Sequence, residues 1–140
     1  MRNGEWFGRA TLATIFLLNG LGVVDQTQAA QELLAHGAPG SLVPFLVIAG
    51  RVLQLVAGAA LVLGWHERVG AVLLALFLVP ATLTAHDFWA YGGPELHGQL
   101  VNFLKNLAIF GGLCFVAFTA PERSPLPQAG SAPGHARVSS

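Results

Sequence analysis

Polar side chains within two long apolar segments of this chain have the chemistry needed to bind a ligand. They are two cations and three amides, and in chain order they are Arg51, Gln54, Asn102, Lys105 and Asn106. Ammonium, guanidinium and amide groups donate hydrogen bonds to carbonyl, carboxylate and phosphate oxygens. A lysine at the centre of a membrane helix costs roughly 2.5–3.5 kcal/mol on insertion scales. We therefore expect these side chains to turn away from lipid and to face other helices.

Arg51 and Lys105 are expected at similar depths in a membrane. Counted from the outer end of its segment, Arg51 lies about 13 Å along a helix and Lys105 about 9 Å. The nearest acidic residues, Asp25 and Asp87, lie just outside the apolar segments. Because a buried cation needs a partner or water, we predict that one of these cations reaches one of these carboxylates in a small outward-facing polar pocket. The alternative is that both cations extend to the outer interface and bind nothing.

The three amides, Gln54, Asn102 and Asn106, also have two interpretations. In the first, they form hydrogen bonds between helices, each worth about 0.6 kcal/mol in a measured case. Alternatively, they and the cations hold the head group of an apolar ligand such as a quinone.

The sequence contains no self-contained catalytic or metal-binding motif. His36, His86 and His97 lie in loops and their spacing matches no metal-ligand signature, so we expect them to be solvated. No Ser or Cys stands in a fixed arrangement with His86, which leaves hydrolase chemistry without support. Cys114 is the only cysteine, so an intrachain disulfide and a dithiol relay are both excluded.

The composition of the 140 residues indicates a membrane protein. Apolar residues make up 54% of the chain and charged residues only 10%, against about 25% in an ordinary soluble domain. A soluble protein of this size needs more polar surface to cover its core. The formal net charge is zero and no cluster of Lys and Arg occurs, which argues against a nucleic-acid partner.

The apolar segments predict an all-α fold, an integral membrane up-down four-helix bundle with short loops. The spans are expected at about residues 6–24, 42–63, 69–85 and 99–118 of a domain at 1–120, followed by a flexible cytoplasmic tail at 121–140. Trp6 and Arg9 are expected to anchor the first span at the interface. Residues 65–68 are expected to form a short polar turn, and residues 31–36 a surface helix that ends at Gly37.

The first apolar segment has a second interpretation. Arg2, the apolar core and residues 27–29 loosely resemble a cleavable signal peptide. The core is long for a signal peptide, however, and Asn19, Gly20 and Gly22 suit a helix that packs against others. We therefore favour a spanning helix.

The distribution of positive charge predicts the orientation. Five arginines lie on one side of the predicted spans, whereas the two loops on the other side have no Lys or Arg. The five are Arg2, Arg9, Arg68, Arg123 and Arg137. By the positive-inside rule, both termini are expected in the cytoplasm.

The chain resembles the DoxX family of small four-helix bacterial membrane proteins over about residues 7–118. Four motifs carry the resemblance, in order and at matching spacing: IFLLNGLG (15–22), GWHER (64–68), AHDFW (85–89) and FLKNLAIFGGL (103–113). One departure is that the family usually has a glutamate where this chain has Gln54, so a carboxylate-dependent role does not carry over. From the third motif we add His86, Asp87 and Trp89 to the candidate ligand-binding cluster.

The resemblance implies a bacterial inner membrane protein linked to oxidoreductase systems, because similar members are subunits of thiosulfate:quinone oxidoreductase or of a redox-associated membrane complex. We therefore expect an accessory subunit, not a catalytic one, whose polar cluster contacts a quinone or a lipid. Its expected partners are the lipid bilayer and other membrane subunits or further copies of itself. Two alternatives stay open: a purely structural subunit that docks onto a larger complex, and a small permease.

Overall fold

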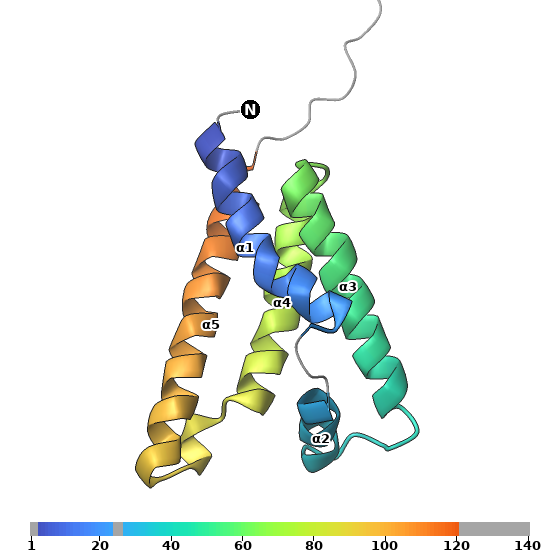
Figure 1. Cartoon of the computed structure of the whole chain (residues 1–140), viewed down its shortest axis with the longest axis vertical. Helices are drawn as coiled ribbons and strands as arrows, with labels where there is room; N and C mark the ends of the chain where they lie inside the picture. Colours follow the sequence, from blue (N-terminus) through green and yellow to red (C-terminus); the bar gives the residue numbers. More distant parts are fainter. Residues whose placement is uncertain (1–2, 24–26, 121–140) are drawn as a thin grey trace, which may run out of the picture.

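The described part of the chain, residues 3–23 and 27–120 of the computed structural model, consists mainly of helices (Figure 1). In chain order they are α1 (Asn3–Leu21), α2 (Thr27–Ala35), α3 (Val43–Leu63), α4 (Glu67–Ala85), the 3₁₀ turn η1 (Phe88–Ala90) and α5 (Gly93–Thr119). By length and composition, α3, α5, and α4 together with η1 are each able to cross a membrane. The predicted all-α fold is confirmed, whereas the predicted tail at 121–140 lies outside the described residues.

The four long helices pack as consecutive neighbours. α3 packs against α1 on one side and α4 on the other, α4 packs against α5, and α1 and α5 touch little (Figure 1). Small residues permit the close approaches: a Cβ added to Gly58 would lie 3.0 Å from Leu17, and one added to Gly70 would lie 2.9 Å from the carbonyl of Ala57. Such small residues at helix crossings are the usual packing device of membrane helices.

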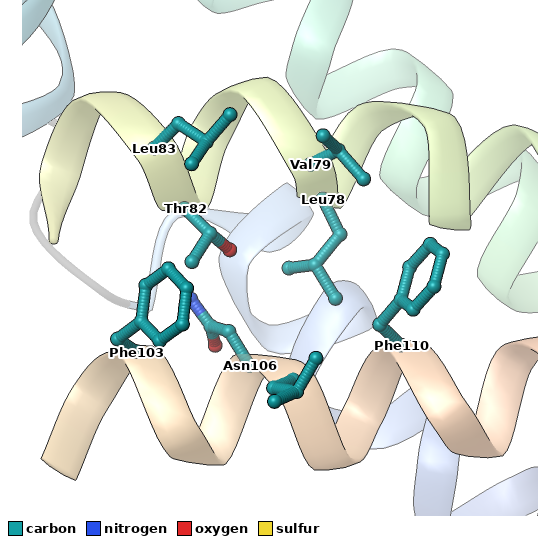
Figure 2. Close-up of a pocket in the computed structure, with 8 residues that line it drawn as sticks. Leu78, Val79, Thr82, Leu83, Phe103, Asn106 and Phe110 are labelled. Carbon is teal, nitrogen blue, oxygen red and sulfur yellow. The ribbon is translucent and has the colours of Figure 1, made fainter. Parts of the chain in front are cut away.

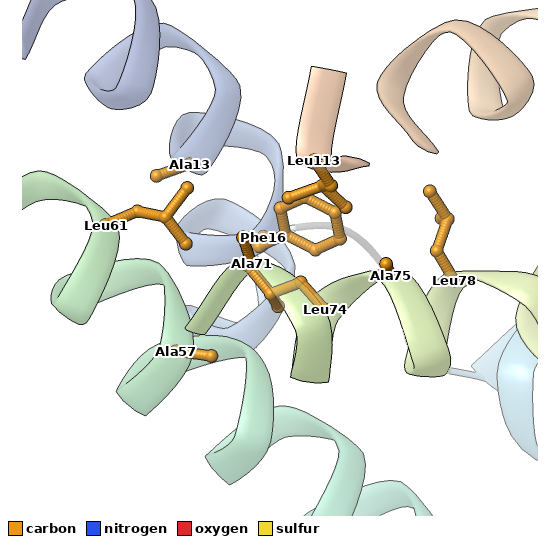
Figure 3. Packing of buried hydrophobic residues seen from close by; sticks show 9 residues of the cluster. All are labelled: Ala13, Phe16, Ala57, Leu61, Ala71, Leu74, Ala75, Leu78 and Leu113. Carbon is orange, nitrogen blue, oxygen red and sulfur yellow. The ribbon is translucent and has the colours of Figure 1, made fainter. Parts of the chain in front are cut away.

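The apolar core lies toward the end of the bundle where α1 begins and α5 ends, which we call the terminal end. Figure 3 shows the core residues, which come from α1, α3, α4 and α5: Ala13, Phe16, Ala57, Leu61, Ala71, Leu74, Ala75, Leu78 and Leu113. Leu61, Leu74 and Leu113 are fully buried. The opposite end of the bundle, which α2 and η1 cover, contributes few residues to this core (Figure 1).

A buried ion pair joins α1 to α4 at the terminal end. Arg9 Nη1 donates a hydrogen bond to Glu67 Oε2, and the two residues are only 9% and 7% exposed. Glu67 is the first residue of α4, because Gly64 (φ 64°) ends α3 and the chain turns back at once. The polar turn expected at 65–68 is therefore shorter than predicted, because α4 already begins at Glu67. That Arg9 anchors the first span at the interface stays a prediction. Each charge requires the other because both are removed from solvent.

A second arginine holds the C-terminal end of α1. Gly22 (φ 78°) ends this helix, and Arg51 Nε of α3 donates a hydrogen bond to the carbonyl oxygen of Gly20 at 3.1 Å. The last carbonyls of a helix lack intrahelical partners and carry partial negative charge, so a cation stabilises them. Since Arg51 lies about 12 Å along α3, α1 ends beside the middle of that helix (Figure 1).

The same arrangement recurs at the terminal end. Arg68, in the first turn of α4, donates a hydrogen bond from Nε to the carbonyl oxygen of Ala117, 2.9 Å away, in the last turn of α5. Arg9, Arg51 and Arg68 thus connect three different pairs of long helices. Each does so through a group that carries full or partial negative charge.

α2 lies across the end opposite the terminal end, and contacts α3 and α4 (Figure 1). It confirms the short helix expected before Gly37 and extends it back to Thr27. Gly37 (φ 84°) follows its last turn, and the N–H of Ala38 bonds to the carbonyl of Leu33 at 2.9 Å. A glycine in this left-handed conformation is a common way to end a helix.

Removing one partner of the buried ion pair should destabilise the bundle. Glu67→Leu removes the buried carboxylate that binds Arg9, so the free energy of unfolding should fall by about 3–5 kcal/mol. The double variant Arg9→Leu/Glu67→Leu should recover most of the loss, because two apolar side chains tolerate this environment. Denaturant unfolding in detergent micelles, followed by circular dichroism, measures both values.

Glu95→Leu is the matched control for this experiment. Glu95 is also an acidic residue in the first turn of a long helix, α5, but it is exposed. Its replacement should change the free energy of unfolding by less than about 0.5 kcal/mol. A Glu67→Leu loss no larger than that of the control would show that the ion pair contributes nothing to stability.

Two glycines test whether Arg51 holds the end of α1. Gly22→Ala and Gly37→Ala each place a side chain at positive φ, which costs roughly 1–2 kcal/mol. At Gly22 the new Cβ would also lie 2.6 Å from Arg51 Nη2, whereas at Gly37 nothing lies within 4 Å. The free energy of unfolding should therefore fall by about 1 kcal/mol more for Gly22→Ala than for Gly37→Ala, because the guanidinium of Arg51 must leave the carbonyl of Gly20. In an Arg51→Leu background the two losses should become equal; equal losses in the wild-type chain would contradict this role.

Candidate functional site

A cavity of about 340 Å³ lies among all five α-helices in the half of the bundle that α2 covers. On the α1 side it is lined by Ile15, Phe16 and Asn19, in the second half of that helix. Apolar residues of α1 and α4, including Phe16 and Leu78, form the part of the wall nearest to the core. Its volume is within the range of small-molecule sites, which starts near 300 Å³.

Five of the eight predicted site residues line this one cavity. They are Gln54 from α3, His86 at the end of α4, and Asn102, Lys105 and Asn106 from α5. The i, i+3 and i+4 spacing of the three α5 residues places them on one helix face, and all three line the cavity.

Gln54 is the most constrained polar group in the wall. It is 4% exposed, and its Nε2 donates a hydrogen bond to the carbonyl of Gly50, four residues earlier, at 3.3 Å. Its Oε1 atom is buried and has no hydrogen-bond partner. A buried amide oxygen without a partner is uncommon, and its desolvation costs about 1–3 kcal/mol. A ligand or water in the cavity that donates a hydrogen bond would remove this cost.

Three further polar residues line the cavity that the sequence analysis did not single out. They are Asn19 of α1, and Gln28 and Glu32 of α2. Gln28 and Glu32 are four residues apart, and therefore on one face of α2. Their spacing, on the side of α2 opposite the exposed Leu34, is the feature of the sequence that could have indicated their place in the cavity wall. Glu32 therefore brings an acidic group to the wall of the cavity, on a short helix that was expected at the surface.

Lys105 and Glu32 bring opposite charges to the wall of the cavity. Lys105 is exposed and Glu32 is half-buried. Neither takes part in an ion pair with another residue of the described ranges 3–23 and 27–120. The ammonium group therefore keeps its donors for water or for a ligand with acceptor oxygens.

The other three predicted residues lie elsewhere. Arg51 is engaged with the end of α1, and Asp87 forms no ion pair with it or with Lys105 in the part of the chain that is described. The expected contact with Asp25 lies outside the described residues. Trp89 is exposed and packs edge-on against Phe88 and Phe103, with ring centroids 5.2 and 6.2 Å away.

His86 is less exposed than a solvated loop residue. Its Nδ1 atom lies 2.9 Å from Oε1 of Gln99, which ties the end of α4 to the second turn of α5. No group of three or more His, Cys, Asp or Glu side chains close enough to hold a metal ion occurs among the residues described. His86 thus positions two walls of the cavity relative to each other.

A second cavity, of about 890 Å³, lies at the terminal end between α1 and α5. Arg9 and Glu67 form part of its wall, together with Gly4, Gly8 and Gly112. This pair is not evident from the sequence, because residues 65–68 are expected there to form a turn. Counting residues along each helix from one face of the membrane, as was done for Arg51 and Lys105, would have placed Arg9 and Glu67 at similar depths.

Comparison with known proteins identifies the family. The profile of the DoxX family matches residues 4–87, which is more than half of the chain and includes α1 to α4. The inner membrane protein YphA of Escherichia coli (strain K12) is 25% identical over 114 residues, 81% of this chain and 80% of YphA. The inner membrane protein YqjF of the same strain is 28% identical over 119 residues, 84% of this chain and 85% of YqjF. No solved structure matches the chain. With its long apolar helices, this chain therefore belongs to the DoxX family and is a multi-pass protein of the inner membrane.

Proposed function

We propose that this protein is a non-catalytic, accessory subunit of a membrane oxidoreductase assembly, and that its cavity holds the polar head of an apolar ligand such as a quinone. The observation that carries the proposal is the Oε1 atom of Gln54, buried in the cavity wall without a hydrogen-bond partner. The association with an oxidoreductase is proposed from the resemblance to DoxX proteins. The class of ligand is inferred from the residues that line the cavity.

The wall suits a flat ring that carries oxygen acceptors. Lys105 and the amide groups of Asn102 and Asn106 supply donors from α5, and Phe16 and Leu78 supply apolar surface from α1 and α4. A quinone has two carbonyl oxygens and an apolar ring, so it matches both kinds of surface. A reduced quinone also has hydroxyl groups, and one of them would supply the donor that Gln54 Oε1 lacks.

The proposed role is to bind, not to react. The cavity offers donors and acceptors, but no nucleophile beside a base and no cluster of metal ligands among the described residues. Electron transfer to a bound quinone then requires a redox centre in another subunit. Holding the ring in a fixed place is the contribution that these residues are able to make.

A purely structural subunit is the second candidate, and the opening between α1 and α5 supports it. Those two helices touch little, and a side chain added to Gly4 or Gly8 would meet nothing within 4 Å. A helix from another subunit would fit against such a small-residue surface. In either case we propose that both termini face the cytoplasm, because Arg9 and Arg68 lie at the terminal end whereas the loops at 22–42 and 86–92 contain no Lys or Arg.

Purified protein should contain quinone that organic extraction releases and mass spectrometry identifies. Gln54→Leu should weaken binding of a methyl-substituted benzoquinone by about tenfold, because an amide that faces the ring is lost. Gln31→Leu is the matched control, since Gln31 is exposed on α2 and does not line the cavity. Its affinity should equal that of the wild-type protein, as measured by equilibrium titration in lipid nanodiscs.

Two results would contradict the proposal. One is wild-type protein that neither carries a quinone after purification nor binds one in the titration. The other is equal affinity in the wild-type and Gln54→Leu proteins. A protein that leaves the membrane only together with partner subunits and binds no quinone would instead support the structural role.

A further inference from the structure

An apolar groove of about 190 Å³ runs between α4 and α5, beside the cavity (Figure 2). Leu78, Val79, Thr82 and Leu83 line it from α4, and Phe103, Asn106, Leu107 and Phe110 line it from α5. Val79, Leu83 and Leu107 are between 43% and 55% exposed. Because both helices are able to span a membrane, this exposed side of the groove faces acyl chains.

Thr82 turns an unpartnered hydroxyl into this groove. Four other threonines in the long helices each donate a hydrogen bond to the carbonyl four residues earlier: Thr11, Thr14, Thr84 and Thr119. Thr82 does not, although it is only 7% exposed and its Oγ1 atom is buried. In Figure 2 its side chain and that of Asn106 point toward each other between the two helices. A hydroxyl that forgoes the usual backbone acceptor, at membrane depth, is available to a ligand.

The groove and the cavity adjoin each other. Leu78 and Asn106 line both of them, so a molecule that reaches from one space into the other passes these two side chains. Half of the sixteen residues that line the cavity are polar, whereas Thr82 and Asn106 are the only polar residues among the eight that line the groove. The lining therefore becomes more apolar from the cavity to the groove, as an amphiphilic molecule does from its head to its chain.

One wall of the groove is held rigid by aromatic packing. Phe103 packs edge-on against Phe88 of η1, with ring centroids 5.1 Å apart, and against Trp89 at 6.2 Å. Such edge-to-face pairs are worth about 0.5–1.5 kcal/mol beyond their burial, and they limit the motion of the ring. Trp89 does not line the groove, but its contact with Phe103 helps to hold that ring in place.

We propose that the α4–α5 groove holds the apolar chain of the ligand whose head lies in the cavity, with Thr82 and Asn106 bonding the polar group where head and chain join. This inference rests on the proposed function and adds the chemical class of the ligand, a single-chain amphiphile, and its route. The chain lies between Phe103 and Phe110, and the ligand enters sideways from the bilayer between α4 and α5. α2 covers the other approach.

The test compares a decyl-substituted benzoquinone with the same ring carrying a methyl group, in nanodiscs of fixed lipid composition. The wild-type protein should bind the decyl compound at least about tenfold more tightly. Leu107→Trp fills the groove and should abolish this preference, while the affinity for the methyl compound stays the same. Leu104→Trp is the matched control: Leu104 is 51% exposed on α5, against 55% for Leu107, but it does not line the groove.

Thr82→Val provides a second, independent readout. It removes a buried hydroxyl that has no partner, so the melting temperature of the ligand-free protein should rise. Its affinity for the decyl compound should nevertheless fall several-fold. A residue with only a structural role would change both quantities in the same direction.

The outcomes separate the two proposals. Binding of both compounds with equal affinity to the wild-type protein, or a decyl preference that survives Leu107→Trp, overturns the groove and leaves the cavity in place. Binding of neither compound overturns the proposed function and this inference together. Loss of the preference in Leu107→Trp but not in Leu104→Trp supports the groove.

Discussion

Charge that is removed from water must find a partner within the protein, and this constraint organises the whole bundle. Arg9 meets a carboxylate, whereas Arg51 and Arg68 meet backbone carbonyls in the last turns of α1 and α5. In lipid no water is present to replace these partners, so each contact fixes how two helices lie relative to each other. Three arginines, one of them within an apolar span, are therefore connections between helices.

The contact between Arg51 and Gly20 has the widest consequences. It stabilises the end of α1 beside the middle of α3, where its last carbonyls would otherwise be exposed to lipid. The apolar core consequently lies in the half where four helices run together, and α2 covers the space beyond α1 in the other half.

The sequence was sufficient for the all-α fold with long apolar helices, because apolar length determines it. The i, i+3, i+4 spacing also placed Asn102, Lys105 and Asn106 on one face of α5, and all three line the cavity. The sequence was insufficient for the partners of the arginines. A carbonyl at a helix end has no sequence signature, so the role of Arg51 depends on where α1 stops. The partner of Arg9 was not foreseen for a related reason: a glycine turn allows α4 to begin earlier than its apolar run, and this buries the carboxylate of Glu67 beside Arg9.

Two buried polar atoms lie in the walls of adjoining spaces. Gln54 lines the cavity and Thr82 lines the groove, and neither Gln54 Oε1 nor Thr82 Oγ1 has a hydrogen-bond partner among the described residues. The two spaces share Leu78 and Asn106 in their walls. The cavity has both polar and apolar lining residues, whereas the lining of the groove is almost wholly apolar. An amphiphilic ligand with its head in the cavity and its chain in the groove would use both of these unmet hydrogen-bonding atoms.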